Sequence, residues 1–362
     1  MLFCDIIFIG DRMKLKVKNI AIFIIIAIAI CSAIYFLFIN DHSVSNDKKT
    51  TKYSEKSLKR IKKLKIDDKV NKKKYSKTLD VAIFSNNFKS DKIAYYEGID
   101  YVDNENIILY INTLADDGLA INEINEIFTD YLSYNNFDIR NAKRYVAYKH
   151  KNSNLNEQDI VTRVNLNLDK PYYTDTKIVE HQDDIYALVN KYNYVDISYV
   201  PSNMKALFNN SSIKMVSVAA DAYEELVRAA RAEAITLVGT TAYRAASFQK
   251  QLYDSYVARD GVEKADTYSA RPGYSEHQLG YSVDLNDPNY QEKRLSFKDY
   301  EWLKNNSYKY GFIIRYPEGS EDITGYQEED WNIRYVGKDV ATKIHDLNIT
   351  FDEYYDLYIA KH

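Results

Sequence analysis

The chain is almost without cysteine. Its two cysteines, Cys4 and Cys31, lie near the N-terminus, and none follows in the remaining sequence. This absence excludes a disulfide-stapled domain and a cysteine-ligated zinc site in the rest of the chain. Any metal bound there must be held by histidine, aspartate, glutamate or an amide oxygen.

Glycine and proline are also scarce, with 11 and 5 residues in a chain of 362, whereas 46% of the residues are hydrophobic. Such a composition indicates a globular protein with a substantial core and argues against a disordered chain. The formal net charge of −4 gives no indication of nucleic-acid binding. The length suits an anchor, a linker and one or two folded units, and it leaves the oligomeric state open.

One nearly unbroken apolar run occupies residues 20–39. About twenty such residues are needed for a helix to cross the hydrocarbon core of a membrane. Lys14, Lys16 and Lys18 precede the run and favour a cytoplasmic location for residues 1–19. A cleaved signal peptide is the alternative. The run is long for that role and no small-x-small site follows it, so we predict an uncleaved transmembrane anchor.

The next two segments show no clustered chemistry. Residues 40–78 are predicted to be a basic linker, in which 59–65 forms a solvated helix or, alternatively, touches anionic lipid or wall polymer. Residues 79–182 are predicted to form a small accessory domain, because apolar side chains recur there at helical spacing. These side chains are Ile121, Ile124, Ile127, Phe128, Tyr131 and Leu132. We assign this domain no catalytic role, and binding of a protein partner is a further possibility for it.

Residues 183–362 alternate predicted helices with short strands. Helices are predicted over 217–233, 247–259 and 297–310, and strands over 235–238, 312–316 and 333–336. Gly239 is expected to end the first strand, and Gly311 the third helix. The pattern predicts an α+β domain, with helices packed on a mostly antiparallel sheet.

Two short runs in this domain carry residues suited to metal chemistry. His277 and Asp284 are good zinc ligands, and Glu329 follows about forty-five residues later, next to Asp330-Trp331. A carboxylate beside a zinc site can act as a general base. Arg244, just after a predicted strand, could stabilise a developing oxyanion. Taken singly, each residue is more often a surface, turn or capping residue, so the order and spacing of the set carry the argument.

The run Ala270-Arg271-Pro272-Gly273-Tyr274-Ser275-Glu276-His277-Gln278, continuing to Asp284, resembles the central motif of the D-alanyl-D-alanine carboxypeptidases of the VanY type. These enzymes belong to the LAS zinc peptidases. Further stretches fit the same family in the right order over about 185–355. They are Leu188-Val189-Asn190-Lys191, Tyr199-Val200-Pro201, Tyr243-Arg244 with Gln249, Arg315-Tyr316-Pro317, Thr324-Gly325-Tyr326 and Arg334-Tyr335-Val336-Gly337.

The resemblance implies a role for individual residues. His277 and Asp284 match zinc ligands, Glu329 matches the catalytic base, and Arg244 matches the arginine that stabilises the transition state. Four residues match positions near the substrate pocket: Ser275, Gln249, Tyr243 and Trp331.

The chain departs from the family pattern at one position. The family motif ends in Glu-x-Trp-His, in which the histidine is the third zinc ligand, and here that position is Asn332. An amide oxygen is a poorer zinc ligand than imidazole. Asn332 could ligate weakly, Asp330 or His345 could replace it, or the site could be inactive. His345 falls in a predicted helix, which favours a structural role.

These features lead to one functional prediction and one alternative. The prediction is a membrane-anchored Zn²⁺ carboxypeptidase that removes the terminal D-alanine from peptidoglycan stem peptides or precursors. It would sit in the cell membrane of a Gram-positive bacterium, with its N-terminus in the cytoplasm and its C-terminal domain outside. The alternative is a catalytically inactive or weakened module that binds wall peptides. The sequence leaves open whether a D,D or an L,D bond is cut.

Overall fold

The computed structural model describes residues 52–102, 104, 106–289 and 294–361, and the chain divides into two compact units, 1–93 and 94–362. The predicted cytoplasmic segment 1–19 and the predicted anchor 20–39 lie outside the described residues. Among the residues that are described, no helix is both long enough and apolar enough to span a membrane.

The described part of the first unit is helical. Helix α2 (Glu55–Leu64) begins at Ser54, whose side chain accepts a hydrogen bond from the backbone N–H of Ser57. Helix α3 (Lys77–Ala82) is capped by Ser76 in the same way. Ile61 of α2 is fully buried, so the described part of the predicted linker contains a packed helix that carries the basic cluster.

The second unit opens with a run of short helices. They are α5 (Ile107–Asp116), α6 (Ile121–Glu126), the π-helix η1 (Ile127–Tyr131), the 3₁₀-helix η2 (Ile139–Asn141), α7 (Ala142–Lys151) and α8 (Glu157–Asn165), while α4 (Ile93–Gly98) lies at the division between units. Ile124, Ile127, Phe128 and Tyr131 are buried. This confirms that the predicted apolar stripe belongs to the core.

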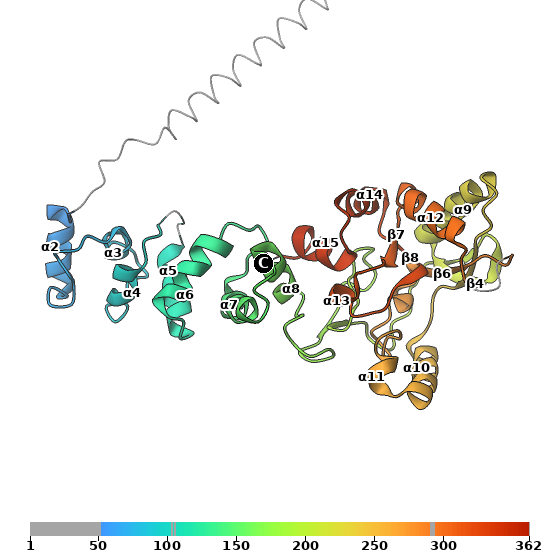
Figure 1. The fold of residues 1–362 in the computed structure, drawn as a ribbon, viewed down its shortest axis with the longest axis horizontal. Helices are drawn as coiled ribbons and strands as arrows, with labels where there is room; N and C mark the ends of the chain where they lie inside the picture. Colours follow the sequence, from blue (N-terminus) through green and yellow to red (C-terminus); the bar gives the residue numbers. More distant parts are fainter. Residues whose placement is uncertain (1–51, 103, 105, 290–293, 362) are drawn as a thin grey trace, which may run out of the picture. The chain divides into compact units, whose positions relative to one another are not determined.

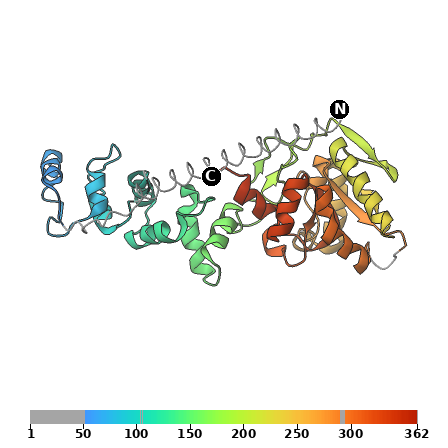
Figure 2. The same ribbon diagram turned by 90° about the horizontal axis from the view of Figure 1, so that it is seen from above.

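The strands of the second unit form a four-stranded antiparallel sheet and two smaller pairs. The sheet has the order β5-β6-β8-β7, and its strands are β5 (Val238–Thr241), β6 (Ser282–Asn286), β7 (Phe312–Tyr316) and β8 (Glu329–Tyr335). The pairs are antiparallel β3 (Met204–Leu207) with β4 (Asn210–Val216), and parallel β1 (Lys177–Ile178) with β2 (Asn193–Tyr194). The predicted α+β class with a mostly antiparallel sheet is confirmed (Figures 1 and 2).

Helices surround this sheet. They are α9 (Ser217–Ala232), α10 (Ala246–Asp260), α11 (Val262–Ala265), α12 (Phe297–Asn306), α13 (Glu321–Thr324), α14 (Lys338–Leu347) and α15 (Phe351–Tyr358), with 3₁₀-helices η3 (Glu276–Leu279) and η4 (Ser307–Tyr310). Side chains of α9 and α12 share a buried cluster with Val283 and Ile333. Because side chains alternate along a strand, Asp284 and Asn332 are directed to the other face of the sheet. The core therefore lies on one face, and the polar residues between its members lie on the other.

The prediction for the first strand was wrong at its boundary. The strand spans Val238–Thr241 rather than 235–238, and Gly239 lies inside it. A Cβ at Gly239 would stand 2.4 Å from Leu207 Cδ1 and 3.1 Å from Val283 Cγ2. The glycine is thus required by close packing within the strand and does not end it.

Other predicted boundaries are close to those observed. The predicted helix 297–310 is α12 followed by η4, and it ends at Gly311, which has a left-handed φ of 85°. The predicted strand 333–336 begins earlier, at Glu329. This extension places Glu329 on the central sheet, in contrast to the solvated acidic run that its neighbours alone would indicate.

Candidate active site

Strand pairing brings the predicted metal ligands together. Asp284 on β6 lies directly opposite Asn332 on β8, and on its other side it pairs with Thr241 of β5. His277 lies in η3, the 3₁₀-helix just before β6. Gly280 ends that helix with φ 76°, a conformation that favours glycine, and leads the chain into β6.

The imidazole of His277 is held in one orientation. Its Nδ1 lies 2.8 Å from the carbonyl oxygen of Ala242, which can only accept, so Nδ1 carries the proton. The backbone N–H of Arg244 donates in return to the carbonyl of His277 at 3.1 Å. The free Nε2 therefore faces the site, 3.5 Å from Oδ1 of Asp284. Such a backbone contact to one ring nitrogen is typical of metal-ligating histidines.

A bulge in β8 places Glu329 beside Asn332. Ile333 pairs with Ile314, and Glu329 pairs with Tyr316. The same stretch of the ladder therefore covers four residue steps in β8 and two in β7. Regular alternation would direct residues three apart to opposite faces. The bulge instead allows Nδ2 of Asn332 to donate to Oε2 of Glu329 at 2.7 Å.

Several buried polar atoms in this site lack a hydrogen-bond partner within the described ranges. They are Oδ1 of Asp284, Oδ1 of Asn332 and Nε of Arg244. Buried polar groups are normally paired, and an unpaired set indicates a ligand, an ion or a catalytic role. Two atoms that bind one zinc at about 2.1 Å in tetrahedral geometry are about 3.4 Å apart. The 3.5 Å between His277 Nε2 and Asp284 Oδ1 fits that spacing.

The third donor is an amide, not an acid or imidazole. Accordingly, in the part of the chain that the structure describes, no group of three or more His, Cys, Asp or Glu side chains is arranged to hold a metal. With the oxygen of Asn332 included, the donor set of His277, Asp284 and Asn332 is complete enough for a three-ligand site.

The charges of the site influence one another strongly. Burial, followed by the negative charge of Asp284, raises the pKa of Glu329 to about 7, although Asn332, Arg244 and Arg294 act in the opposite direction. Burial alone would raise the pKa of Asp284, but His277, Arg244 and Arg294 hold it below its ordinary value. Burial also lowers the pKa of Arg244, against the attraction of both carboxylates. A carboxylate with a pKa near neutrality is suited to accept and return a proton.

The four residues expected near the substrate pocket lie in different environments. Gln249 and Ser275 are buried, and Nε2 of Gln249 donates to the carbonyl of Ala270 at 2.7 Å. Tyr243 and Trp331 are partly exposed and directly precede Arg244 and Asn332 in the sequence. Tyr243 and Trp331 are therefore accessible to a substrate, whereas Gln249 is held in the protein by the 270 loop.

Arg294 is a site residue that the sequence did not reveal. Its guanidinium lies over the ring of Trp331 at 4.9 Å, and Nη1 is 3.9 Å from Oδ2 of Asp284. The side chain is 45% exposed, so it stands at the rim of the site. It follows β6 in a polar loop without any motif, and only the folded chain brings it to Asp284.

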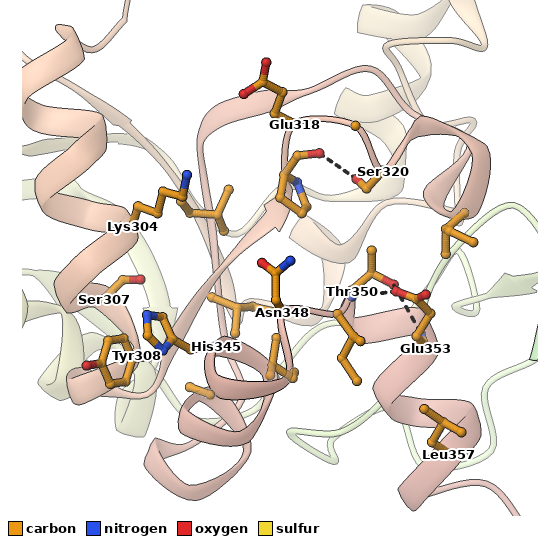
Figure 3. Close-up of a pocket in the computed structure, with 18 of the residues that line it drawn as sticks. Lys304, Ser307, Tyr308, Glu318, Ser320, His345, Asn348, Thr350, Glu353 and Leu357 are labelled. Carbon is orange, nitrogen blue, oxygen red and sulfur yellow. Dashed lines mark hydrogen bonds between the residues drawn. The ribbon is translucent and has the colours of Figure 1, made fainter. Parts of the chain in front are cut away.

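The two possible substitutes for Asn332 lie elsewhere. His345 stacks on Tyr308 at 3.8 Å, and both line a separate pocket of about 700 Å³ (Figure 3). None of the predicted site residues lines that pocket. Burial raises the pKa values of Tyr300 and Glu328, and the negative charge of Asp330 adds to both shifts, so Asp330 lies near these two groups. Asn332 is the residue that the fold places opposite Asp284.

Comparison with known proteins identifies the family to which this sequence belongs. The VanY family model, D-alanyl-D-alanine carboxypeptidase, matches residues 212–338. The protein YodJ of Bacillus subtilis is 36% identical over 206 residues, which are 52% of this chain and 76% of YodJ. A D-alanyl-D-alanine carboxypeptidase of Enterococcus faecalis is 33% identical over 185 residues, 48% of this chain and 67% of that protein.

A solved structure adds a metal-bound example. It is a mutant of the D,D-pentapeptidase VanY from a VanB-type resistance cassette in complex with Zn(II), 34% identical, covering 47% of this chain and 97% of that chain, with a TM-score of 0.43. On the sequence relationships, the present chain belongs to the VanY D-alanyl-D-alanine carboxypeptidase family.

Proposed function

We propose that this chain is a membrane-anchored zinc D-alanyl-D-alanine carboxypeptidase that removes the terminal D-alanine from peptidoglycan stem peptides. The proposal is supported by the 3.5 Å between His277 Nε2 and Asp284 Oδ1 and by the pairing of Asn332 opposite Asp284, beside the carboxylate of Glu329, whose pKa is raised to about 7. The apolar run at 20–39 supports attachment to the cell membrane, with the C-terminal domain facing the wall of a Gram-positive bacterium.

The donor set fits a zinc ion, although its third member is the weakest. A zinc ion held by His277, Asp284 and Asn332 would supply the positive charge that acidifies the attacking water and polarises the scissile carbonyl. The amide of Asn332 serves two neighbours, because its nitrogen donates to Glu329 while its oxygen is left for the metal. This arrangement ties the position of the base to that of a ligand.

Glu329 moves the proton in this proposal. It accepts a proton from the water while the water oxygen bonds to the carbonyl carbon. It then returns the proton to the nitrogen of the leaving D-alanine as the carbon–nitrogen bond breaks. The carboxylate ends as it began, and the products are D-alanine and a peptide shortened by one residue.

Arg244 is placed to stabilise the negative charge that develops on the carbonyl oxygen. It is a partly buried cation, with its Nε enclosed by protein, and its charge is attracted by both Asp284 and Glu329. A preorganised donor in a water-poor site stabilises a developing oxyanion far more than water does. Tyr243 and Trp331, both partly exposed, would contact the peptide.

A second candidate function rests on the same amide. A neutral oxygen donor holds zinc less tightly than imidazole, so a weakened site would leave a module that binds wall peptides without cleaving them. The retention of Glu329 next to Asn332 favours the enzyme, because binding alone does not need a base.

The deciding experiment uses the full chain in mild detergent, supplied with zinc, and a stem pentapeptide ending in D-alanyl-D-alanine. Loss of one alanine is followed by mass spectrometry, and a tetrapeptide substrate tests for L,D cleavage. Cleavage that stops with chelator and in Glu329→Ala supports the proposal. No cleavage by wild type, but cleavage by Asn332→His, would indicate a scaffold disabled by one ligand. No cleavage by either, with peptide still bound, would establish the binding module.

A further inference from the structure

A fully buried carboxylate lies immediately before the histidine of the site. Glu276 is 3% exposed and stands between two arginines that are themselves buried. Its Oε1 is 2.9 Å from Nε of Arg315 on β7, and its Oε2 is 3.3 Å from Nη1 of Arg334 on β8. Arg334 is fixed further by donating to the carbonyl of Ile185 at 2.8 Å. The turn that carries His277 is thus bound to two strands of the sheet.

The ion pairs continue from the sheet to the last helix. Nη1 of Arg315 contacts Oδ2 of Asp352 on α15 at 2.8 Å, and Oδ1 of Asp352 accepts a hydrogen bond from Asn190 at 2.9 Å. Arg315 and Asp352 are each 1% exposed. Two arginines and two carboxylates therefore share one buried cluster in which the positive and negative charges balance.

Helix α15 carries the contacts on to the helices that precede the sheet. Asp356, one turn after Asp352, accepts a hydrogen bond from Nδ2 of Asn136 at 2.6 Å. Asn136 is 1% exposed, and its carbonyl accepts from Asn165 of α8 at 2.7 Å. Figures 1 and 2 show α15 lying next to α8. We call the series Glu276, Arg315, Asp352, Asp356 and Asn136, with Arg334 at its side, the buried polar chain.

A gain in stability alone does not explain the buried polar chain well. Replacing a buried ion cluster by apolar side chains of similar volume is often neutral or stabilising, so a retained cluster is better explained by the geometry that it fixes. The geometry fixed here is that of the 3₁₀-helix η3, which holds His277. Asn136, Asp352 and Asp356 all lie outside residues 212–338, the part matched by the family model.

We propose that Glu276 is a positioning residue for His277, and that the buried polar chain makes helix α8 and the segment around Asn136 a working part of the active site. The inference rests on the proposed function for the meaning of His277 as a metal ligand. The helices before the sheet act through α15, and they touch neither substrate nor metal. Loss of any contact in the buried polar chain loosens η3 and misplaces Nε2 of His277.

The test compares three variants of the full chain, each checked for folding by thermal unfolding. Glu276→Gln removes the charge at the site end, and Asp356→Asn alters the far end. The matched control is Asp322→Asn, which breaks the ion pair of Asp322 with Arg163 of α8 and thus also loosens α8, but outside the buried polar chain. Zinc affinity is measured by competition with a chelating dye, and kcat and KM are measured on the pentapeptide.

We expect Glu276→Gln to weaken zinc binding about 10–100-fold, the usual effect of losing a residue that orients a ligand, and to lower kcat with little change in KM. Asp356→Asn should show the same pattern at a few-fold, and Asp322→Asn should match wild type. Folded Glu276→Gln protein with wild-type zinc affinity would overturn the proposal. Equal effects of Asp356→Asn and Asp322→Asn would overturn the part that involves the helices.

A second variant guards against misfolding. If Glu276→Gln does not fold, Arg315→Lys keeps the balance of charge but loses the two-pronged contact to Glu276 and Asp352, and it is judged by the same two measurements. Zinc affinity does not depend on turnover. A wild type that binds zinc but cleaves no peptide would therefore remove the proposed function and still test the positioning role of Glu276.

Discussion

The active site and the buried polar chain are neighbours on the same strands, and both bury charge, yet they treat it in opposite ways. Arg334 is two residues from Asn332 on β8, and Glu276 precedes His277. In the buried polar chain, the side chains of Glu276, Asp352, Arg315 and Arg334 each lie within 3.3 Å of an opposite charge. In the site, the closest contacts of Asp284 to a basic group are 3.5 Å and 3.9 Å.

The difference shows how one sheet separates architecture from chemistry. Desolvated charges that lie close to an opposite charge hold their positions, whereas a desolvated carboxylate without an opposite charge in close contact has its pKa raised. Glu329, with its pKa raised to about 7, belongs to the second kind. The paired region supplies the rigidity that the unpaired region needs, because an active site works only when its groups stay within a fraction of an ångström.

The largest effect is expected from neutralising the base. Glu329→Gln keeps the shape of the side chain and can still accept from Asn332, but it cannot take a proton from water. Turnover of the pentapeptide should fall by about 10²–10⁴-fold with KM nearly unchanged. Glu328→Gln, next in the chain, is the control and should retain activity. Turnover within tenfold of wild type would mean that another group is the base.

The next largest effect is expected from breaking the ion pairs of the buried polar chain. Arg315→Met leaves Glu276 and Asp352 buried without their shared partner, so the free energy of unfolding should fall by about 3–5 kcal/mol. Arg294→Met, at the half-exposed rim, should cost less than about 1 kcal/mol. Urea unfolding in the presence of chelator measures both. Similar losses for the two variants would show that the distinction between paired and unpaired regions has no energetic basis.

Much of this architecture could be predicted because it follows from local pattern. The helix at 217–233 has apolar side chains at helical spacing and the helix at 247–259 is followed by Gly261, and both predictions agree with the observed helices within a residue or two. His277, Asp284 and Glu329 stand in stretches that resemble the motifs of the family, and the pairing of β6 with β8 places Asp284 opposite Asn332. The bulge that turns Glu329 toward Asn332 could not be predicted, because register is set by the partner strand.

The residues that escaped prediction depend on contacts between distant segments. Arg294 lies in a polar loop, and its place beside Trp331 and Asp284 results from the fold. Asn136 and Asp356 are separated by 220 positions, and both are of residue types that usually lie on the surface. Gly239 was interpreted as a stop because its neighbours in space, Leu207 and Val283, come from other strands. The pattern of a single sequence predicts periodic elements and motifs, but it does not predict such tertiary contacts.

The third prediction concerns the active site and changes Asn332, the proposed third zinc ligand, to histidine. Imidazole in place of the amide oxygen is a stronger zinc ligand, so zinc affinity should rise about tenfold or more. The substitution also removes the amide nitrogen of Asn332, which donates to Oε2 of Glu329 at 2.7 Å. Asp330→His, two positions away, is the control and should leave affinity unchanged. A dye-competition titration decides, and equal gains for both variants would contradict the assignment of Asn332 as the third ligand.

The smallest effect concerns the metal-free protein and its dependence on pH. Because the pKa of Glu329 in the folded protein is about 7, above the ordinary glutamate value of 4.5, the folded state prefers the protonated carboxyl. Its contribution to stability is therefore complete below pH 4.5 and is lost as the pH rises through 7. Glu329→Gln removes this loss, so the variant should be more stable than wild type at pH 8, by about 1–2 kcal/mol, and nearly equal to it at pH 5. Urea unfolding with chelator at the two pH values measures the difference. A variant that is less stable than wild type at pH 8 would show that the carboxylate of Glu329 is satisfied in the fold, as the charges of the buried polar chain are.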